Sequence, residues 1–470
     1  MKIENKRWIA LLVLITAHLL TIVDIFIVNI AIPSIQKGLK TTNADTQLVV
    51  AMYMIGFASF LIIGGRAGDY YGRKKLFIIG LLFFMIFSAS CGFATSPEQL
   101  ILFRFLQGIS AGLMSPQVLS YIQILFPGHK ERTYALGCYG IAIGIGTMLG
   151  QFLGGFLVEV KPVFVDQSWR YIFLINIPIC IINIFLAVLF LKNSADTSAQ
   201  HMDYKSTFIL CIVLILMLFS ITIGLEYSLI IPFITLSFSI LLWIYFIKRQ
   251  KKKGQENSAL LNLALFQYKN FNLAIAAAAF FMFMLDAYFF VLAIFLQEGM
   301  HLLPVEAGQF IIFQGSGFII TSLFAPRLIL RFGKNILIFG TCLIITALIL
   351  QLILFNHSTI DWKSYLIMVI HGTGVALVLP SFANIALKGL PENIIGNASG
   401  VYSTIQQFAG ALGIAVTGGL FYYNINKDYD FLDFYNSLVY TALIHFFCLI
   451  CIILLLIRLP KSILPVNNRP

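Results

Sequence analysis

Charged residues are scarce in this sequence: Asp, Glu, Lys and Arg make up 11% of its 470 residues, whereas 59% are hydrophobic. A soluble protein of this length would need more polar surface to cover its core, so the composition excludes an ordinary soluble domain. Apolar runs of about 20 residues recur, each long enough to cross roughly 30 Å of hydrocarbon. They lack the alternation of a membrane barrel. We therefore expect an all-α polytopic membrane protein with fourteen transmembrane helices.

The sequence also lacks several patterns that are typical of disulfide-bonded proteins, enzymes and metalloproteins. The chain has seven Cys, all within predicted spans, which argues against a disulfide framework. The sequence has no glycine-rich nucleotide loop, no His-rich cluster and no loop long enough for a soluble catalytic domain. We expect neither an enzyme nor a resident metal or cofactor, and a non-transporting sensor is kept as an alternative.

Positive charge is in excess, with a net charge of +11. The cations concentrate in loops on one side of the predicted bundle, while acids lean to the other side, as in "NKDYDFLDFYN" (426–436). This distribution follows the positive-inside rule, so we expect both termini in the cytoplasm and no nucleic-acid partner. The apolar run after "MKIENKRW" is expected to be a retained first span and not a signal peptide.

The spans divide as six, two and six. A polar segment and a basic segment separate a central helix pair from the flanking groups, which suggests an internal duplication. The expected domains are an N-terminal six-helix bundle (1–191), a cytoplasmic linker (192–205), an extra transmembrane pair (206–247), a basic cytoplasmic loop (248–270) and a C-terminal six-helix bundle (271–470).

Two acids lie deep in predicted spans. Asp286 interrupts the apolar stretch "FFMFMLDAYFF" (280–290), and it follows Lys269 by the same seventeen residues that separate Asp24 from Arg7. An ionised side chain at this depth costs about 2.5–3.5 kcal/mol on insertion scales, and such residues usually face a cavity or a partner. We expect the two acids to take corresponding places in the two bundles.

A basic partner for one of these acids occurs in "RFLQGISAG" (104–112). Arg104 is predicted at a similar depth to Asp24, and we expect it to keep Asp24 ionised until a proton or another cation competes. A purely structural ion pair is the alternative. Asp286 has no basic partner in its own helix, and its loss of water contact favours the protonated form.

Aromatic residues share the helical face of Asp286. Phe283, Phe289 and Phe290 lie three or four residues away, and ring faces beside a carboxylate suit a lipophilic cation. The alternative is that these rings face lipid.

Two glycine-containing motifs are candidates for conformational roles. The turn "GGRAGDYYGRKKLF" (64–77) combines small residues with an acid and cations, and it could otherwise be a plain positive loop. The run "GTMLGQFLGG" (146–155) places small residues on one helical stripe, which lets two helices approach closely. The candidates for gating are Gly65, Asp69, Gly72, Arg73, Lys74, Gly146, Gly150, Gly154 and Gly155.

The order and spacing of these motifs resemble the major facilitator superfamily. Within it, "DIFIVNIAIP" (24–33) is similar to the first-span signature of the fourteen-helix drug:proton antiporters, and "WRYIFLINIP" (169–178) and "QQFAGALGIA" (406–415) extend the similarity. Three positions depart from the family pattern: Phe26 stands in place of Thr, Gln151 in place of Pro, and Leu330 in place of an acid in the second repeat.

The resemblance implies a proton-coupled exporter that expels amphipathic, often cationic, drugs or antiseptics by alternating access. An exporter of a physiological metabolite, a lipid or a metal–antibiotic chelate is the alternative. The resemblance further implies a monomer in the bacterial cytoplasmic membrane that is driven by the proton gradient. The residues expected to couple protons or bind substrate are Asp24, Asn29, Arg104, Gln107, Phe283, Asp286, Phe289 and Phe290.

Overall fold

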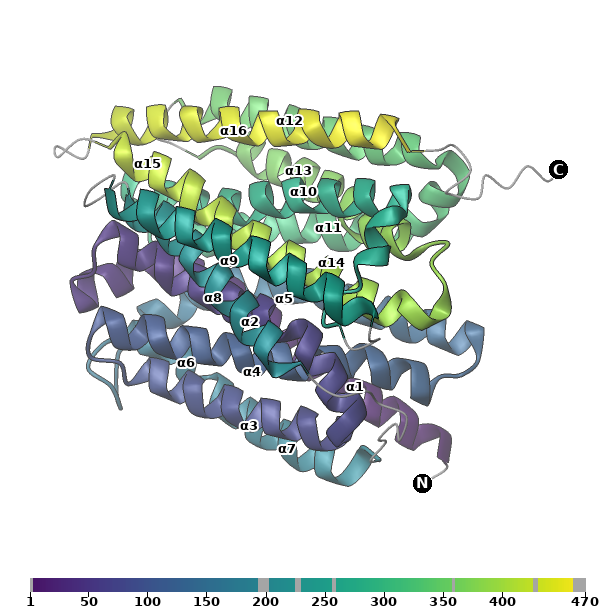
Figure 1. Ribbon diagram of the computed structural model, residues 1–470. Helices are drawn as coiled ribbons and strands as arrows, with labels where there is room; N and C mark the ends of the chain where they lie inside the picture. Colours follow the sequence, from purple (N-terminus) through teal and green to yellow (C-terminus); the bar gives the residue numbers. More distant parts are fainter. Residues whose placement is uncertain are drawn as a thin grey trace. The chain divides into compact units, whose positions relative to one another are not determined.

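The computed structural model describes residues 3–192, 203–224, 230–255, 259–356, 360–425 and 430–459. Within these ranges the regular structure is entirely helical (Figure 1). Most of the predicted linker at 192–205 lies outside the described residues. The same holds for part of the basic loop and of the acidic segment at 426–436.

The first half of the chain forms eight long helical segments, the sixth of which is divided at Ile175. They are α1 (Ile3–Leu39), α2 (Asn43–Tyr71), α3 (Arg73–Gly92), α4 (Pro97–Leu125), α5 (His129–Glu159), α6 and α7 (Tyr171–Leu174 and Asn176–Phe190), α8 (Tyr204–Gly224) and α9 (Ile230–Gln255).

The second half forms six further segments, two of which contain a short π-helical stretch. They are α10 with η3 (Lys269–Ile294 and Phe295–Gly299), α11 (Pro304–Phe332), α12 (Lys334–Leu354), α13 (Trp362–Leu387), α14 with η4 and α15 (Glu392–Gly413, Ile414–Gly418 and Gly419–Tyr423) and α16 (Phe431–Ile457).

Thirteen of these segments are long and apolar enough to cross a membrane. The exception is α4, which is 29 residues long but carries Arg104, Gln107 and Gln117 at buried positions, and these polar residues lower its mean hydropathy. The predicted all-helical architecture is confirmed, with fourteen long helical segments among the described residues, and the chain is a multi-pass membrane protein.

Local sequence explains where the central helices begin. Ser96 precedes α4 and accepts a hydrogen bond from the Gln99 amide, while Pro97 occupies a first-turn position that needs no donor. Asp361 precedes α13 and accepts from the Ser364 amide in the same way. The two helices therefore start from equivalent signals, as a duplicated chain predicts.

The described chain forms two compact units. The first comprises residues 1–25, 35–146 and 161–263, and the second comprises 26–34, 147–160 and 264–470. Within the first unit α2 packs on α4, and α3 lies between α4 and α7 (Figure 1). Within the second unit α13 packs on α11 and α12, and α10 packs on α14 and α16.

Short pieces of α1 and α5 belong to the second unit. Gly154 of α5 lies so close to α1 that an added Cβ atom would be 2.5 Å from the Ile27 carbonyl oxygen. The neighbouring Gly155 packs against the Pro304 carbonyl at the start of α11. The small residues of α5 therefore fix both contacts, because a larger side chain at either position would collide with backbone.

Candidate functional site

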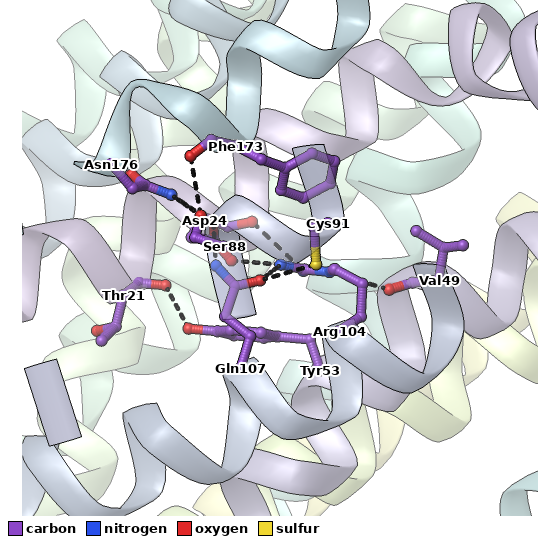
Figure 2. A network of polar contacts seen from close by, with 10 residues as sticks. All are labelled: Thr21, Asp24, Val49, Tyr53, Ser88, Cys91, Arg104, Gln107, Phe173 and Asn176. Carbon is purple, nitrogen blue, oxygen red and sulfur yellow. Dashed lines mark hydrogen bonds and ion pairs between the residues drawn. The ribbon is translucent and has the colours of Figure 1, made fainter. Parts of the chain in front are cut away.

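A fully buried carboxylate, Asp24, lies at the centre of a polar network in the first unit (Figure 2). Its Oδ2 atom pairs with Arg104 Nη1 of α4. Its Oδ1 atom accepts hydrogen bonds from Gln107 Nε2 at 2.9 Å and from Asn176 Nδ2 at 3.0 Å. Three donors from two other helices thus hold one buried carboxylate and satisfy both of its oxygens.

Arg104 is also fully buried and makes contacts beyond the ion pair. Nη1 donates to Gln107 Oε1 at 2.8 Å, and Nε donates to the Val49 carbonyl oxygen at 3.2 Å. The guanidinium carbon lies 4.2 Å from the centre of the Tyr53 ring, within cation–π range. Arg104 therefore connects α1, α2 and α4 through a single planar group, which a Lys could not reproduce.

Asn176, Ser88 and Tyr53 belong to this network but were not among the residues predicted from sequence. Asn176 Nδ2 also donates to Ser88 Oγ at 2.9 Å, and Ser88 Oγ donates to the Phe173 carbonyl at 2.9 Å, while Tyr53 supports Arg104. The signal for Asn176 was present, because an amide within an apolar span needs a partner. Ser88 and Tyr53 carry no such signal, since hydroxyl groups are common in transmembrane helices.

Asp286 of α10 has different surroundings. Its side chain is 6% exposed, and among the described residues it has neither a hydrogen-bond nor an ion-pair partner. The rings of Phe289 and Phe290 are fully buried within the second unit and pack edge-to-face on Phe26 and Tyr422, respectively. These two rings therefore face protein and not lipid, whereas Phe283 is half-buried.

Asn29 of α1 belongs to the second unit, separate from Asp24. It is 2% exposed, and its Oδ1 atom has no hydrogen-bond partner among the described residues. One residue further on, the Ile30 carbonyl oxygen accepts a hydrogen bond from Gln297 Nε2 at 2.9 Å. The structure thus does not place Asn29 in the network around Asp24.

The turn between α2 and α3 is held by a local ion pair. Arg73 donates to Asp69 Oδ1 through Nε and Nη2, at 2.9 Å and 2.7 Å. Gly72 lies between them with a φ of 98°, a conformation that residues with a Cβ atom rarely adopt. Lys74 Nζ donates to the Val188 carbonyl oxygen of α7 at 2.6 Å. At Gly65 an added Cβ atom would be 3.8 Å from Pro116 Cβ, so the packing there does not require a glycine.

Of the other two predicted glycines of α5, one contacts α1 and the other is buried. An added Cβ atom at Gly146 would be 2.9 Å from the Ile22 side chain, and Gly150 is buried. Gln151, which stands at the position where Pro was expected, is fully buried, and both polar atoms of its side chain lack partners among the described residues. Its backbone continues in the helix, so no proline kink forms there.

A bundle of membrane-spanning helices with buried ionised groups is the arrangement of membrane transporters. The model of the Major Facilitator Superfamily matches residues 14–414, and the chain belongs to this family. It is a transporter of small molecules and not an enzyme, and its homologues are drug-resistance and export proteins of the fourteen-helix type.

Named relatives and a solved structure agree with this assignment. The chain is 30% identical over 430 residues to a probable actinorhodin transporter of Streptomyces coelicolor, covering 89% of this chain and 73% of the relative. It is 28% identical over 407 residues to the multidrug resistance protein Stp of Mycobacterium tuberculosis, covering 84% and 72%. A bacterial homologue of the lysosomal transporter Spinster, solved inward-facing and unoccupied, shares the fold with a TM-score of 0.69 at 14% identity, covering 97% and 98%.

Proposed function

We propose that the chain is a proton-coupled exporter that expels amphipathic, often cationic, small molecules from the cytoplasm by alternating access. The observation that carries this proposal is the buried network around Asp24, in which one carboxylate is held by Arg104, Gln107 and Asn176. Relatives named for multidrug and puromycin resistance support the class of substrate.

Proton and substrate compete for negative charge in this mechanism. A proton that enters from outside neutralises Asp286, Asp24 or both, and the loss of charge weakens the hold on a cationic substrate. The substrate then leaves outward, and the carboxylates release their protons toward the cytoplasm. Protonation of Asp24 also removes the negative charge of its ion pair with Arg104. The contact between α1 and α4 therefore weakens when Asp24 binds a proton.

The gating motifs have supporting roles in this proposal. The Asp69–Arg73 turn and the small residues of α5 form contacts that one state of the cycle keeps and the other breaks. The positive-inside distribution supports a cytoplasmic location for the α2–α3 turn and both termini. Two six-helix bundles would rock about a central site, with the extra pair α8 and α9 beside the first bundle.

Efflux from proteoliposomes tests the proposal. Purified protein is reconstituted with a monovalent cationic dye inside, and an imposed pH gradient drives its release. We expect Asp24→Asn or Asp286→Asn to abolish gradient-driven efflux while the protein still inserts. Glu98→Gln is the matched control, because Glu98 lies exposed in the first turn of the helix that carries Arg104. Wild-type rates in both neutral variants would show that the proposed coupling is wrong.

A second candidate substrate class is a metabolite, which the similarity to a probable actinorhodin transporter favours. Thermal stabilisation of the purified protein by a panel of ligands separates the two classes. Cationic antiseptics should stabilise it under the main proposal, whereas neutral or acidic metabolites alone should do so under the second.

A further inference from the structure

The two compact units repeat one packing pattern, and close glycine contacts give its register. In the first unit Gly108 packs on the Tyr53 carbonyl oxygen, and in the second Gly372 packs on the Gln314 carbonyl oxygen. The sequence distance from Gly108 to Gly372 equals that from Pro116 within α4 to Pro380 within α13. Helices α4 and α13 are therefore equivalent, residue by residue.

This register identifies the counterparts of the Arg104 site. At the same sequence distance, Met368 is the counterpart of Arg104, and His371 is the counterpart of Gln107. The adjacent helices α3 and α12 match in the same way. An added Cβ atom at Gly80 of α3 would lie 3.1 Å from the Ser110 carbonyl oxygen, and one at Gly340 of α12 would lie 3.1 Å from the Gly374 carbonyl oxygen. The sequence distance from Gly80 to Gly340 equals that from Cys91 to Gln351, so Gln351 is the counterpart of Cys91. The Cys91 Sγ atom lies 3.8 Å from Gln107 Oε1.

Tyr288 takes the place of Asp24 in this pattern. The offset that relates α4 to α13 also relates Asp24 to Tyr288, whose hydroxyl donates to Gln351 Oε1 at 3.0 Å with Met368 Sδ 3.4 Å away. Its ring stacks on His371 at 4.5 Å between centroids, and His445 of α16 lies 6.3 Å away. Asp286 is two residues earlier on α10, and because a helix turns about 100° per residue it faces nearly the opposite way.

Buried polar atoms in this cluster lack protein partners. Tyr288, His371, His445 and Gln351 are all less than 5% exposed. Among the described residues, both ring nitrogens of His371, Nε2 of His445 and Nε2 of Gln351 have no hydrogen-bond partner. Buried groups of this kind usually bind internal water, which makes about three hydrogen bonds to them. The first unit shows the opposite situation, since both oxygens of Asp24 are paired there.

We infer that Tyr288, His371, His445 and Gln351 form a second proton-binding centre, inside the C-terminal bundle, which takes up its proton on the two imidazoles. A proton on His371 is stabilised by the face of the Tyr288 ring stacked against it. Gln351 and internal water supply acceptors for its N–H groups. This inference rests on the proposed proton coupling, and it adds a site that the deep acids do not provide.

The charges near the centre are few. The acidic and basic residues of α11, α12, α13, α14 and α16 lie near the helix ends, so Asp286 of α10 is the one carboxylate deep within these described helices. Further buried ionisable groups on the packed elements include Cys448 of α16 and Tyr402 of α14, while Cys342 of α12, Tyr365 of α13 and Cys451 of α16 are more exposed. An ionised Asp286 would favour a proton on the imidazoles, and neutralising it would remove that attraction.

Histidine NMR of the full chain in lipid nanodiscs tests the inference without any transport. The chain has seven histidines, and His371→Gln and His445→Gln assign the two signals. We expect at least one of these imidazoles to change from neutral to cationic between about pH 8 and pH 5. His301, which is exposed, is the internal reference. Two rings that stay neutral throughout this range would overturn the inference.

Transport measurements test whether this proton-binding centre takes part in the transport cycle. If the centre binds and releases a proton in each transport cycle, His371→Gln and His445→Gln should each lower gradient-driven dye efflux at least about tenfold. Dye binding without a gradient should not change. A titrating pair whose replacement leaves efflux at the wild-type rate would refute its role in transport. Because the NMR titration needs neither dye nor gradient, it distinguishes failure of this inference from failure of proton-coupled efflux.

Discussion

The two halves of the molecule place different chemistry at one equivalent position. In the first unit that position holds Asp24, a carboxylate paired with Arg104 and hydrogen-bonded by two amides. In the second it holds Tyr288, a neutral ring among imidazoles and an amide. Equivalent positions thus hold a fully paired carboxylate in one unit and an incompletely paired polar cluster in the other, so the two units should respond differently to mutation and to protons.

The largest expected effect comes from breaking the ion pair. Arg104→Gln leaves Asp24 buried without its cation, so we expect a loss of about 3–5 kcal/mol in the free energy of unfolding in mixed micelles. Asp24→Asn combined with Arg104→Gln should recover much of this loss, because neither charge then remains. Arg7→Gln is the control, since Arg7 pairs with Glu131 at a partly exposed site. Equal losses at Arg7 and Arg104 would contradict the comparison.

A second contrast concerns the two deep acids. Asp24→Asn should cost about 2–4 kcal/mol, because it leaves Arg104 as an unpaired buried cation. Asp286→Asn should change the unfolding free energy by less than about 1 kcal/mol, since no partner loses a hydrogen bond. Unfolding of both variants by the same denaturant series measures the difference. A large destabilisation by Asp286→Asn would reveal a structural role for that acid.

A smaller effect should distinguish the two tyrosines. Tyr288→Phe removes the donor to Gln351 and should cost about 1 kcal/mol. Tyr53→Phe removes a hydrogen bond of 3.3 Å to the Thr21 carbonyl but keeps the ring that supports Arg104. Because a long hydrogen bond is a weak one, we expect Tyr53→Phe to cost less than Tyr288→Phe. Thermal unfolding of the matched pair checks the order, and a larger loss for Tyr53→Phe would reverse the assignment.

The smallest effect is expected where an Arg–carboxylate pair lies at the edge of a bundle. Arg249 Nη2 donates to Asp203 Oδ1 at 2.9 Å. Burial raises the pKa of Asp203, but hydrogen bonds from Ser206 and Arg249 outweigh it and leave the pKa below its ordinary value. Such a carboxylate stabilises the folded state above its unfolded pKa, and this stabilisation is lost as the pH falls through the folded pKa.

Asp203→Asn should therefore lower stability by at most about 1 kcal/mol at pH 7. The difference from wild type should disappear in acid, where Asp203 is protonated in both states. Melting temperatures of the two proteins from pH 7 to pH 3 measure this convergence. A gap that stays constant down to pH 3 would show that the carboxylate charge does not matter at this site.

Sequence reasoning predicted the parts of the site that leave a compositional signal. Asp24, Arg104 and Asp286 are rare charges in apolar spans, and each could be selected because burial of a charge needs a reason. Asn176 carried a weaker signal as an amide in an apolar span, whereas Ser88 and Tyr53 carried none, because hydroxyl groups are common in such helices. The pairing of Asp24 with Asp286 came from distance along the chain, whereas the contacts pair Asp24 with Tyr288, two residues away and on another helical face.

The amino-acid sequence by itself determined that the chain crosses the membrane many times as helices, because a hydrocarbon layer accepts only segments that satisfy their own backbone. It also determined which helices carry unusual charges. Tertiary structure alone decided which polar groups meet, since hydrogen bonds such as that of Asn176 to Asp24 join residues 152 positions apart. It also decided which groups are left without a partner, because that depends on the rotation and depth of each packed helix and not on its composition.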